Sequence, residues 1–387
     1  MMRHLNKPRG TKYRVIYVFS RYCYPLRAAR NKTYIFGYEG WYMGIKGVEL
    51  RKYIPIIKWQ KNERLALSFL EEDIKQCVLP CLEIRNHDQH TKLLECFEEV
   101  WDAPAIIDYA NPQGVLTVER IRELREFLKY ARDNEHPIVP ALNPMDALVY
   151  SNTNLIKAIS KHEEIALRLR VSDFKITDAN IANCKKADEL FAGKNKRLIV
   201  DFGNSPQEKD AVNLNDLDLN LKKLRSEGFK NIHIISGAFP SDLSSVKNGP
   251  KNFIRYDLEF WKNIQSRHSR GPLGYGDYGI LSPGWTEETL QRRGSRVAIR
   301  YTCEGSWFIL RGANAKKSES IALSELLLNV YEDVFKGADY SWGDKIIADR
   351  ANQELKDKDK KSGGYHFAEA WNHHITFVIK ELIKKTP

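Results

Sequence analysis

The stretches IALRLRV at residues 165–171 and RLIVD at residues 197–201 decide the fold of this chain. Each is a short apolar run rich in branched side chains, which is typical of a strand buried in a parallel sheet. The residues between them show helical periodicity instead. A strand, a helix and a second strand in this order predict a parallel β-α-β unit.

The same unit repeats on both sides of this stretch, at intervals of roughly 25 to 35 residues. The candidate strands are residues 53–58, 78–84, 105–109, 137–142, 165–171, 197–201, 231–236 and 252–257. Eight parallel strands with crossover helices fit a closed, TIM-like (β/α)8 barrel of the α/β class. An open, doubly wound sheet is the alternative, because a sequence does not show closure.

Two of the connecting segments carry helix signals of their own. Residues 117–133 place apolar side chains largely on one helical face, and Thr117 is a candidate N-cap. Residues 215–227 alternate leucines with solvated Lys and Asp, and Gly228 follows as a candidate C-terminal cap. Both segments are therefore predicted to be crossover helices.

Nearly all of the net charge of +11 lies at the N-terminus. Residues 1–52 contain twelve Lys and Arg against two Glu, a net charge of +10, and ten aromatic residues stand among them. Cations that hold phosphates and rings that stack on bases suit single-stranded nucleic acid. The alternatives are an extension packed on the barrel, and a segment upstream of the natural start, since Met43 lies just ahead of the first strand.

The six cysteines are scattered and no two have CxxC spacing, so neither a disulfide framework nor a zinc site is indicated. The most apolar early stretch, residues 13–19, is short and is soon followed by Arg21, so no secretory or membrane segment is predicted. With 42% hydrophobic and 29% charged residues, the composition is that of a folded, soluble chain. We expect a cytoplasmic protein with reduced thiols and no membrane partner.

After about residue 270 the repeat ends. A Gly-rich segment at residues 271–279 leads to two predicted strands, 296–303 and 306–311, joined by a turn at Glu304 and Gly305. Two helices are predicted next, at about 319–335 and 342–355. The expected organisation is thus a basic N-terminal extension (1–52), a βα barrel (53–270) and a C-terminal α+β lobe (271–387).

Several short motifs carry a resemblance to a known family. YIPIIK at residues 53–58, followed by Glu63, is similar to the opening signature of the beta protein family, which is named for a protein of T-even phages. Later motifs follow in the family's order, namely GDYG at 276–279, IRYT at 299–302, Trp307 with Arg311 and Gly312, YSWGD at 340–344, and WNHHITF at 371–377. The resemblance covers residues 53–387. It implies a setting of conflict between phages and hosts, and it implies no established reaction.

In a βα barrel, reactive groups collect at the mouth formed by the C-terminal ends of the strands. The candidates there are Lys58, Glu83, Arg85, Asp108, Asn143, Arg168, Arg170, Asp201, Asn204 and Ser236. Glu83, Asp108 and Asp201 are candidate ligands for Mg²⁺, because hard cations prefer carboxylate oxygens. Lys58 and an arginine, for which Arg168 and Arg170 are the candidates, would bind phosphate, as metal-assisted hydrolysis of a phosphodiester or a nucleotide requires. The alternative is an inward-facing network of ion pairs that fills the barrel.

The later motifs supply a second set of candidates, Asp277, Arg300, Arg311, Asp344, His373 and His374. The glycines around Asp277 allow that loop to fold over a ligand, or simply to turn from barrel to lobe. Arg300 and Arg311 could bind a carboxylate or phosphate, or pair with Asp277 or Asp344 to lock the lobe. His373 is the candidate general base. Since adjacent histidines point in different directions, at most one of the pair is expected to face a given site.

We expect the lobe to close over the barrel and form one polar site, with Lys58, Asp201, Asp277 and His373 in catalytic roles and a phosphate-bearing ligand or nucleic acid bound. This hypothesis fails if these residues are dispersed or buried as ion pairs. Two alternative functions involve no catalysis. One is a recognition protein that binds a phage or host protein, and the other binds single-stranded nucleic acid through residues 1–52.

Overall fold

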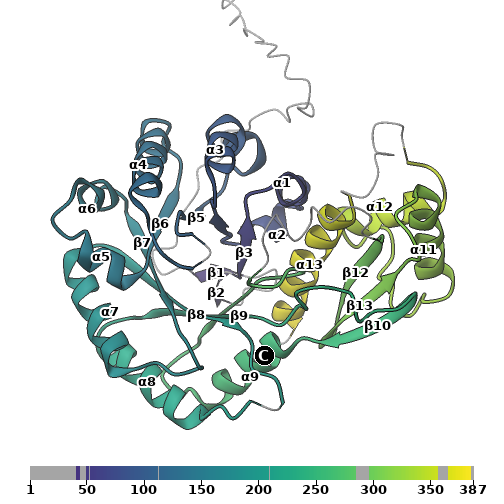
Figure 1. Ribbon diagram of the computed structural model, residues 1–387. Coiled ribbons are helices and arrows are strands. Elements are labelled where there is room, and N and C mark those ends of the chain that lie inside the picture. Colours follow the sequence, from purple (N-terminus) through teal and green to yellow (C-terminus); the bar gives the residue numbers. More distant parts are fainter. Residues whose placement is uncertain are drawn as a thin grey trace, which may run out of the picture. The chain divides into compact units, whose positions relative to one another are not determined.

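The computed structural model describes residues 41–43, 49–51, 53–111, 113–208, 210–284, 296–355 and 365–384. Eight parallel strands form a closed barrel in the order β11-β3-β4-β5-β6-β7-β8-β9 (Figure 1). Their bounds are β3 Ile54–Lys58, β4 Cys81–Glu83, β5 Ala105–Asp108, β6 Ile138–Leu142, β7 Glu164–Arg170, β8 Asn195–Asn204, β9 Asn231–Gly237 and β11 Gly274–Asp277. The TIM-like barrel predicted from the sequence is therefore confirmed.

Helices surround this barrel on its outside (Figure 1). They are α1 Lys61–Ser68, α2 Glu72–Gln76, α3 His87–Val100, α4 Val118–Asp133, α5 Pro144–Val149, α6 Asn154–Ile159, α7 Asp178–Leu190, α8 Leu214–Ser226 and α9 Tyr256–Arg267. Both predicted caps are present. Thr117 accepts the backbone N–H of Arg120 at the start of α4, and Gly228 follows α8 with a φ of +100°.

The strand side chains alternate between two cores, because successive residues of a strand point to opposite faces. Ile56, Cys81 and Ile106 belong to a small apolar cluster inside the barrel. Ile57 and Leu82 belong to the larger cluster between the strands and the helices. This alternation also determines which polar residues point into the barrel.

The eighth strand is where the sequence-based assignment is wrong. It was placed at residues 252–257, but β10 (Gly249–Ile254) pairs antiparallel with β13 (Ser306–Arg311) in a separate sheet. The Gly-rich strand β11 closes the barrel instead, between β9 and β3. The lobe sheet thus takes one strand from before residue 270, and the barrel takes one from after it.

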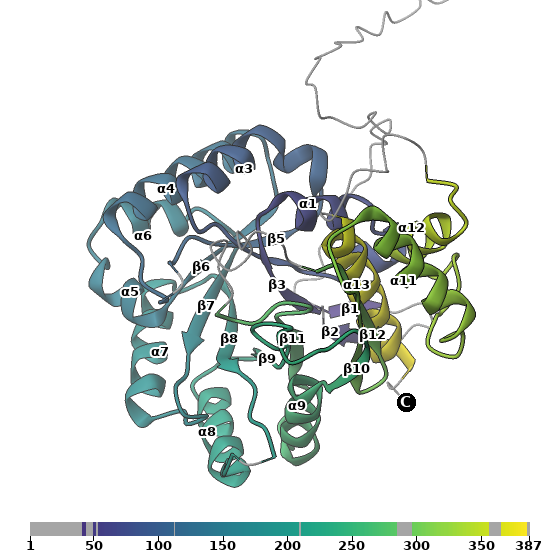
Figure 2. The ribbon, with the colours of Figure 1, turned by 45° about the vertical axis from the view of Figure 1, so that its right-hand side comes forward.

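The lobe is built on a three-stranded sheet in the order β10-β13-β12, where β12 is Ala298–Cys303. The predicted hairpin is confirmed, with Gly305 at a φ of +68° in its turn. The helices of the lobe's described residues are α11 Lys317–Asn329, α12 Trp342–Ala351 and α13 Tyr365–Lys384. Helix α13 contacts β12 and α12 of the lobe and also α1 and α2 of the barrel (Figure 2), so it joins the two parts.

In the N-terminal extension, β1 (Trp41–Met43) and β2 (Glu49–Arg51) form a two-stranded antiparallel sheet. The prediction that residues 1–52 bind single-stranded nucleic acid otherwise falls on residues outside those that the structure describes. Among the described segments, no helix is long and apolar enough to cross a membrane.

Candidate functional site

Five barrel strands carry a polar inward-facing residue near their C-terminal ends. Two residues earlier, each of these strands carries an apolar inward residue. The five polar residues are Lys58, Glu83, Asp108, Arg168 and Asp201, and all are buried. Because inward residues of a barrel stack in layers, they form one polar layer at the mouth, above the apolar interior.

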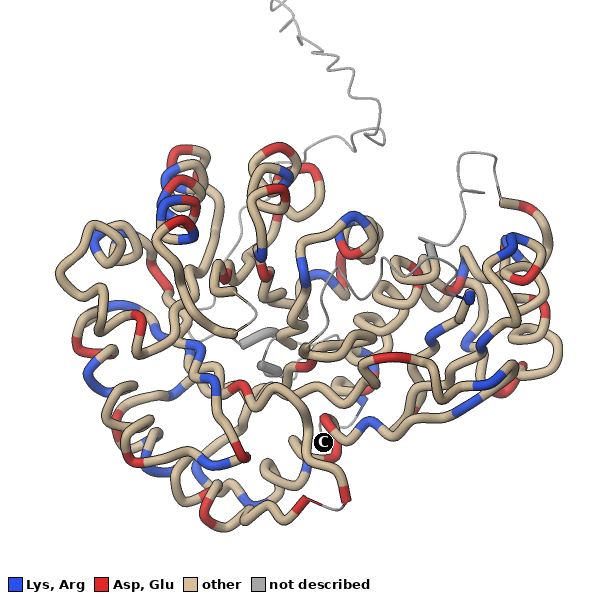
Figure 3. Tube along the Cα trace, viewed as in Figure 1, with Lys and Arg blue, Asp and Glu red and all other residues tan. Residues whose placement is uncertain are grey.

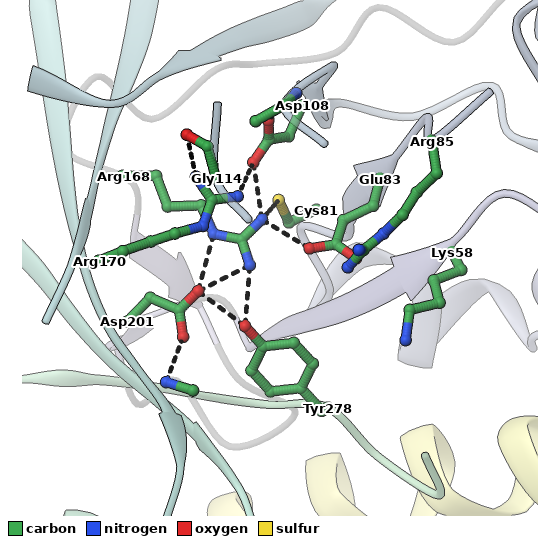
Figure 4. Close-up of polar contacts among 12 residues, drawn as sticks. Lys58, Cys81, Glu83, Arg85, Asp108, Gly114, Arg168, Arg170, Asp201 and Tyr278 are labelled. Carbon is green, nitrogen blue, oxygen red and sulfur yellow. Dashed lines mark hydrogen bonds and ion pairs between the residues drawn. The ribbon is translucent and has the colours of Figure 1, made fainter. Parts of the chain in front are cut away.

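Arg168 lies at the centre of this layer (Figure 4). Its guanidinium donates to Glu83 at 2.9 Å and to Asp108 and Asp201 at 2.7 Å each. The hydroxyl of Tyr278 donates to Asp201 at 2.7 Å and accepts from Arg168 at 3.0 Å. Burial acts to lower the pKa of Arg168, but attraction to Asp201 and the other acidic groups raises it well above its usual value. The guanidinium therefore stays charged.

The three carboxylates that were expected to bind a divalent cation do converge, but they converge on this guanidinium. A metal ion would have to displace Arg168, which is 1% exposed, and would leave it buried without partners, which is strongly unfavourable. The second oxygens of Asp108 and Asp201 accept the backbone N–H groups of Ala110 and Gly203. The mouth thus holds the alternative arrangement, a network of ion pairs in place of the expected metal site.

Two arginines lie around this network. Arg170 donates to Asp108 at 3.1 Å and to the carbonyl of Gly114 at 3.5 Å, and its side chain is 23% exposed. Arg85 donates to Glu83 through Nε at 3.0 Å and also through Nη2. Both arginines therefore reach the solvent side of the buried carboxylates.

Lys58 completes the set of cations. Its ammonium group donates to the carbonyl of Ser282 at 3.4 Å. Burial lowers the pKa of Lys58 to about 8, with Glu83 opposing the shift and Arg85 adding to it. An amine with this pKa exchanges its proton near neutral pH.

We call seven residues the mouth cluster, namely Lys58, Glu83, Arg85, Asp108, Arg168, Arg170 and Asp201. They contain four cations and three carboxylates, so the cluster carries one net positive charge. The three carboxylates are paired with the three arginines, and Lys58 supplies the additional positive charge. The mouth cluster is thus arranged to attract an anion.

Glu63, from the first turn of α1, interacts electrostatically with Lys58 and is buried. Among the described residues its Oε2 has no hydrogen-bond partner. Burial raises the pKa of Glu63 to about 7, with Lys58 opposing the shift. The carboxyl group is therefore held near its titration point at neutral pH.

We expect the substitution Glu63→Gln to stabilise the protein at pH 8. The folded-state pKa of about 7 lies above the ordinary value of 4.5, so the stability linked to the protonated carboxyl is full below pH 4.5 and is lost as the pH rises through 7. Removing this titration should raise the free energy of unfolding at pH 8 by on the order of 3 kcal/mol. Urea unfolding at pH 8 and pH 5 tests this, and an equal effect at both pH values would contradict it.

Asp277 lies outside the mouth. It points to the outer face of the barrel, where it accepts hydrogen bonds from the hydroxyls of Tyr53 and Tyr275 and from the backbone N–H of Gly279. His374 of α13 approaches the same carboxylate at 3.2 Å. Burial lowers the pKa of His374, although Asp277 opposes the shift, so the neutral imidazole with its proton on Nε2 is favoured.

A second set of hydrogen bonds continues from His374 into the lobe. The hydroxyl of Thr302 lies 2.9 Å from Nδ1 of His374, and the carbonyl of Thr302 lies 2.9 Å from Nε2 of His373. The Nδ1 of His373 is 2.8 Å from Asp344, which also accepts from Tyr301. We call this set the lobe cluster, and it consists of Tyr53, Asp277, Tyr301, Thr302, Asp344, His373 and His374, all buried.

The remaining lobe candidates have other partners. The guanidinium of Arg300 stacks on the ring of Phe367 at 4.1 Å, and burial, together with Arg311, lowers the pKa of Arg300 to about 10. Arg311 donates to the carbonyls of Leu243 and Val246. The hypothesis that these arginines pair with Asp277 or Asp344 is therefore wrong, because those carboxylates take hydroxyl and imidazole partners instead.

The motif glycines and Asn372 have packing roles. A Cβ on Gly343 would lie 2.2 Å from the carbonyl oxygen of Glu369, so α12 and α13 approach each other too closely for any side chain there. Asn372 accepts from the backbone N–H of Gly343 and donates to the carbonyl of Ala66 in α1. These motifs thus hold α12, α13 and the barrel together.

The single convergent site expected from the sequence is not what the structure shows. Asp277 and His373, the candidate catalytic groups of the lobe, are fully buried in the lobe cluster, whereas Lys58 and Asp201 belong to the mouth cluster. Sequence reasoning missed Tyr278, which bonds to both Asp201 and Arg168. Strand alternation could have found it, because Tyr278 follows Asp277 and so points to the opposite face, into the barrel.

Comparison with known proteins finds that residues 53–380 match the family model described as Beta protein. No curated protein matches the chain in sequence. Among solved structures, it is similar to the biosynthetic arginine decarboxylase of Campylobacter jejuni, with a TM-score of 0.37 and 13% identity over 86% of this chain and 56% of that one. It is also similar to a class V chitininase from Pseudomonas fluorescens Pf-5, with a TM-score of 0.29 and 10% identity over 72% of this chain and 92% of that one. The chain thus spans little more than half the length of the decarboxylase.

Proposed function

The chain belongs to the Beta protein family, and from the geometry of its barrel mouth we propose that it binds a small phosphate-bearing ligand there. The excess of cations over carboxylates in the mouth cluster carries this proposal. Arg168, Arg85 and Arg170 together balance the charge of the three carboxylates, and Lys58 adds a further positive charge. Arg85, Arg170 and Lys58 then supply the donors for an anion, and arginine suits phosphate because it binds two oxygens at once.

Apolar side chains next to Arg170 favour a nucleotide over inorganic phosphate. Val115, Val118, Met145 and Val149 are each at least half exposed. The first two lie in the segment after Gly114, whose carbonyl accepts from Arg170, and the last two lie on α5. The hydroxyl of Tyr150 donates to the carbonyl of Leu116, which keeps the two segments together. A ligand with a ring beside its phosphate would cover this apolar surface.

Hydrolysis of a nucleotide or phosphodiester at this site would rely on the protein's own cations. The expected metal position is taken by Arg168, so Arg85 and Arg170 would offset the negative charge that develops on the phosphate. Lys58 could supply or accept a proton, since burial lowers its pKa to about 8. Conflict between phages and hosts is the setting that the family resemblance implies for this activity.

We expect calorimetric titration with pyrophosphate, AMP and ATP to show binding of at least one of them, in buffer that contains EDTA. The substitution Arg170→Ala should weaken that binding about tenfold or more, because a hydrogen bond to a charged group contributes about 1.5–3 kcal/mol. Asp108 keeps its bond to Arg168 in this variant, so the fold should persist.

Lys316→Ala is the matched control, because Lys316 is an exposed cation of the lobe. It should leave the Kd unchanged. The proposal is wrong if none of the three compounds binds, or if Arg170→Ala binds them as tightly as the unmodified protein. Binding that is lost in EDTA would show that a metal ion, rather than the cations of the mouth, holds the phosphate.

A further inference from the structure

Helices α4 and α6 lie side by side on the outside of the barrel (Figure 2), and their side chains line a groove. Its volume is about 620 Å³. Six exposed cationic side chains line it, namely Arg122, Arg125, Lys129, Arg132, Lys157 and Lys161. Lys and Arg positions along both helices are visible in Figure 3.

Helix geometry aligns the cations of α4 into one row. With 3.6 residues per turn, positions 122, 125, 129 and 132 share one face and span about 15 Å along the axis. Lys157 and Lys161, four residues apart, form the opposite wall. Glu126, the carboxylate among the described lining residues, pairs at 3.4 Å with His90 of α3. The described lining of the groove thus carries six cations against one carboxylate.

The positive charge of the groove is largely uncompensated within the described part of the chain. Arg122 pairs with Glu119 at 3.8 Å, and Arg132 pairs with Asp133 at 3.0 Å. The remaining four cations form no ion pair with any described residue, and these are Arg125, Lys129, Lys157 and Lys161. Like charges at this spacing repel one another and destabilise the fold slightly. Stability alone therefore gives no reason for this arrangement.

A histidine next to the groove has a lowered pKa. His162 follows Lys161 directly. Burial lowers the pKa of His162 to about 4, and Arg132 and Lys194 add to the shift. Arg132, a cation of the groove, thus contributes to this shift, although burial is its main cause.

We propose that this groove binds the sugar–phosphate backbone of nucleic acid without reading the base sequence. Two facing rows of cations can contact successive phosphates of one strand, and such contacts need no base recognition. Leu128 and Ala158 are the apolar residues of the described lining, and no aromatic ring stands among them to stack on bases. An acidic protein segment would need apolar or aromatic anchor pockets for affinity, and this lining has little to offer them.

The test is fluorescence anisotropy with a labelled duplex of random sequence and the full chain, over a series of salt concentrations. We expect Arg125→Glu with Lys129→Glu to raise the Kd about tenfold or more at about 50 mM salt. The slope of log Kobs against log salt should become about two units less steep, because two phosphate contacts are lost. Both side chains are exposed, so circular dichroism and the Tm should change little.

The matched control is Lys316→Glu with Lys317→Glu, which makes the same change in net charge on the lobe. It should alter the Kd and the slope far less. Any binding by residues 1–52 is the same in the groove variant and in this control. If the control loses as much affinity for the duplex as the groove variant, the effect comes from net charge alone and the proposal is wrong. Should the first variant misfold, Lys157→Glu with Lys161→Glu tests the opposite wall. The proposal is also overturned if groove variants bind the duplex normally but lose binding to poly-glutamate, which would point to an acidic protein partner.

Discussion

The substitution Arg168→Met should destabilise the folded protein by about 5 kcal/mol or more, because it removes the shared partner of three buried carboxylates. Glu83, Asp108 and Asp201 are each at most 3% exposed, so water cannot replace the lost guanidinium. The free energy of unfolding of a domain is commonly about 5–15 kcal/mol, so a loss of this size removes much of the protein's stability. Urea unfolding followed by circular dichroism at pH 7.5 measures it.

The pH dependence of Arg168→Met separates lost charge pairing from lost packing. Without Arg168, the three buried carboxyl groups lose a shared positive partner, so their charged forms are less stable in the folded protein. Protonation removes that disadvantage, so the variant's deficit relative to the unmodified protein should shrink between pH 7.5 and pH 5. A deficit that does not change with pH would contradict the ion-pair account.

Arg197→Met is the matched control for this prediction. Arg197 is also buried, at 1% exposure, but its partner Glu164 has a side chain that is 28% exposed. Glu164 can therefore be hydrated once its partner is gone, and we expect a loss of about 1–2 kcal/mol. If Arg168→Met is as stable as Arg197→Met, the convergence of three carboxylates on Arg168 contributes little to the free energy of unfolding.

The second large effect is expected from Asp277→Leu, which should destabilise the protein by about 4 kcal/mol. This carboxylate accepts from Tyr53, Tyr275 and Gly279 and contacts His374, and each buried donor left without a partner costs about 1–3 kcal/mol. Because the cluster joins α13 to the barrel, the backbone amides of α13 should lose protection from hydrogen exchange first.

Asp277→Asn serves as the conservative partner of that variant. Its amide oxygen can still accept from Tyr53 and Gly279, so we expect less than half the loss of stability seen with leucine. Hydrogen exchange followed by mass spectrometry compares the two variants. If Asp277→Leu leaves the protection of α13 unchanged, the lobe cluster does not hold the lobe to the barrel.

Much of the barrel is predictable from the sequence, because its parallel strands are buried on both faces and therefore appear as continuous branched runs. The strands at 165–171 and 197–201 correspond to β7 and to the centre of β8. The mouth residues followed from the strand ends, since charged residues two positions beyond an apolar inward residue must share its face. Thus the members of the mouth cluster were found before their contacts were known.

The eighth strand was not predictable by the same criterion. Strand β11 has the sequence GYGD and contains no branched residue. Its glycines are required by packing, because a Cβ on Gly274 would lie 2.2 Å from the ring of His233 and one on Gly276 would lie 2.4 Å from the carbonyl oxygen of Ile54. The local sequence does not favour a strand here. Pairing with the neighbouring barrel strands determines this conformation instead. The first residues of the predicted eighth strand, Asn252–Ile254, belong to β10, which pairs with β13 of the lobe instead.

The roles of the motif residues depend on contacts between distant parts of the chain. His374 meets Asp277 across 97 positions of sequence, and Arg168 meets Glu83 across 85. The motifs identified residues that are structurally critical, but they could not show that the lobe residues bond to one another rather than to a ligand. Nor could residue type show that the mouth carboxylates would be paired with an arginine rather than a metal.

The central claim is that the mouth cluster binds the ligand whereas the lobe cluster maintains the structure. The most direct test is the Kd of Asp277→Asn for the phosphate compound that the unmodified protein binds most tightly, measured on folded protein. The account predicts a Kd within about twofold of the unmodified value together with a lower Tm. A folded Asp277→Asn protein that no longer binds the compound would place the lobe cluster in the binding site and contradict the account.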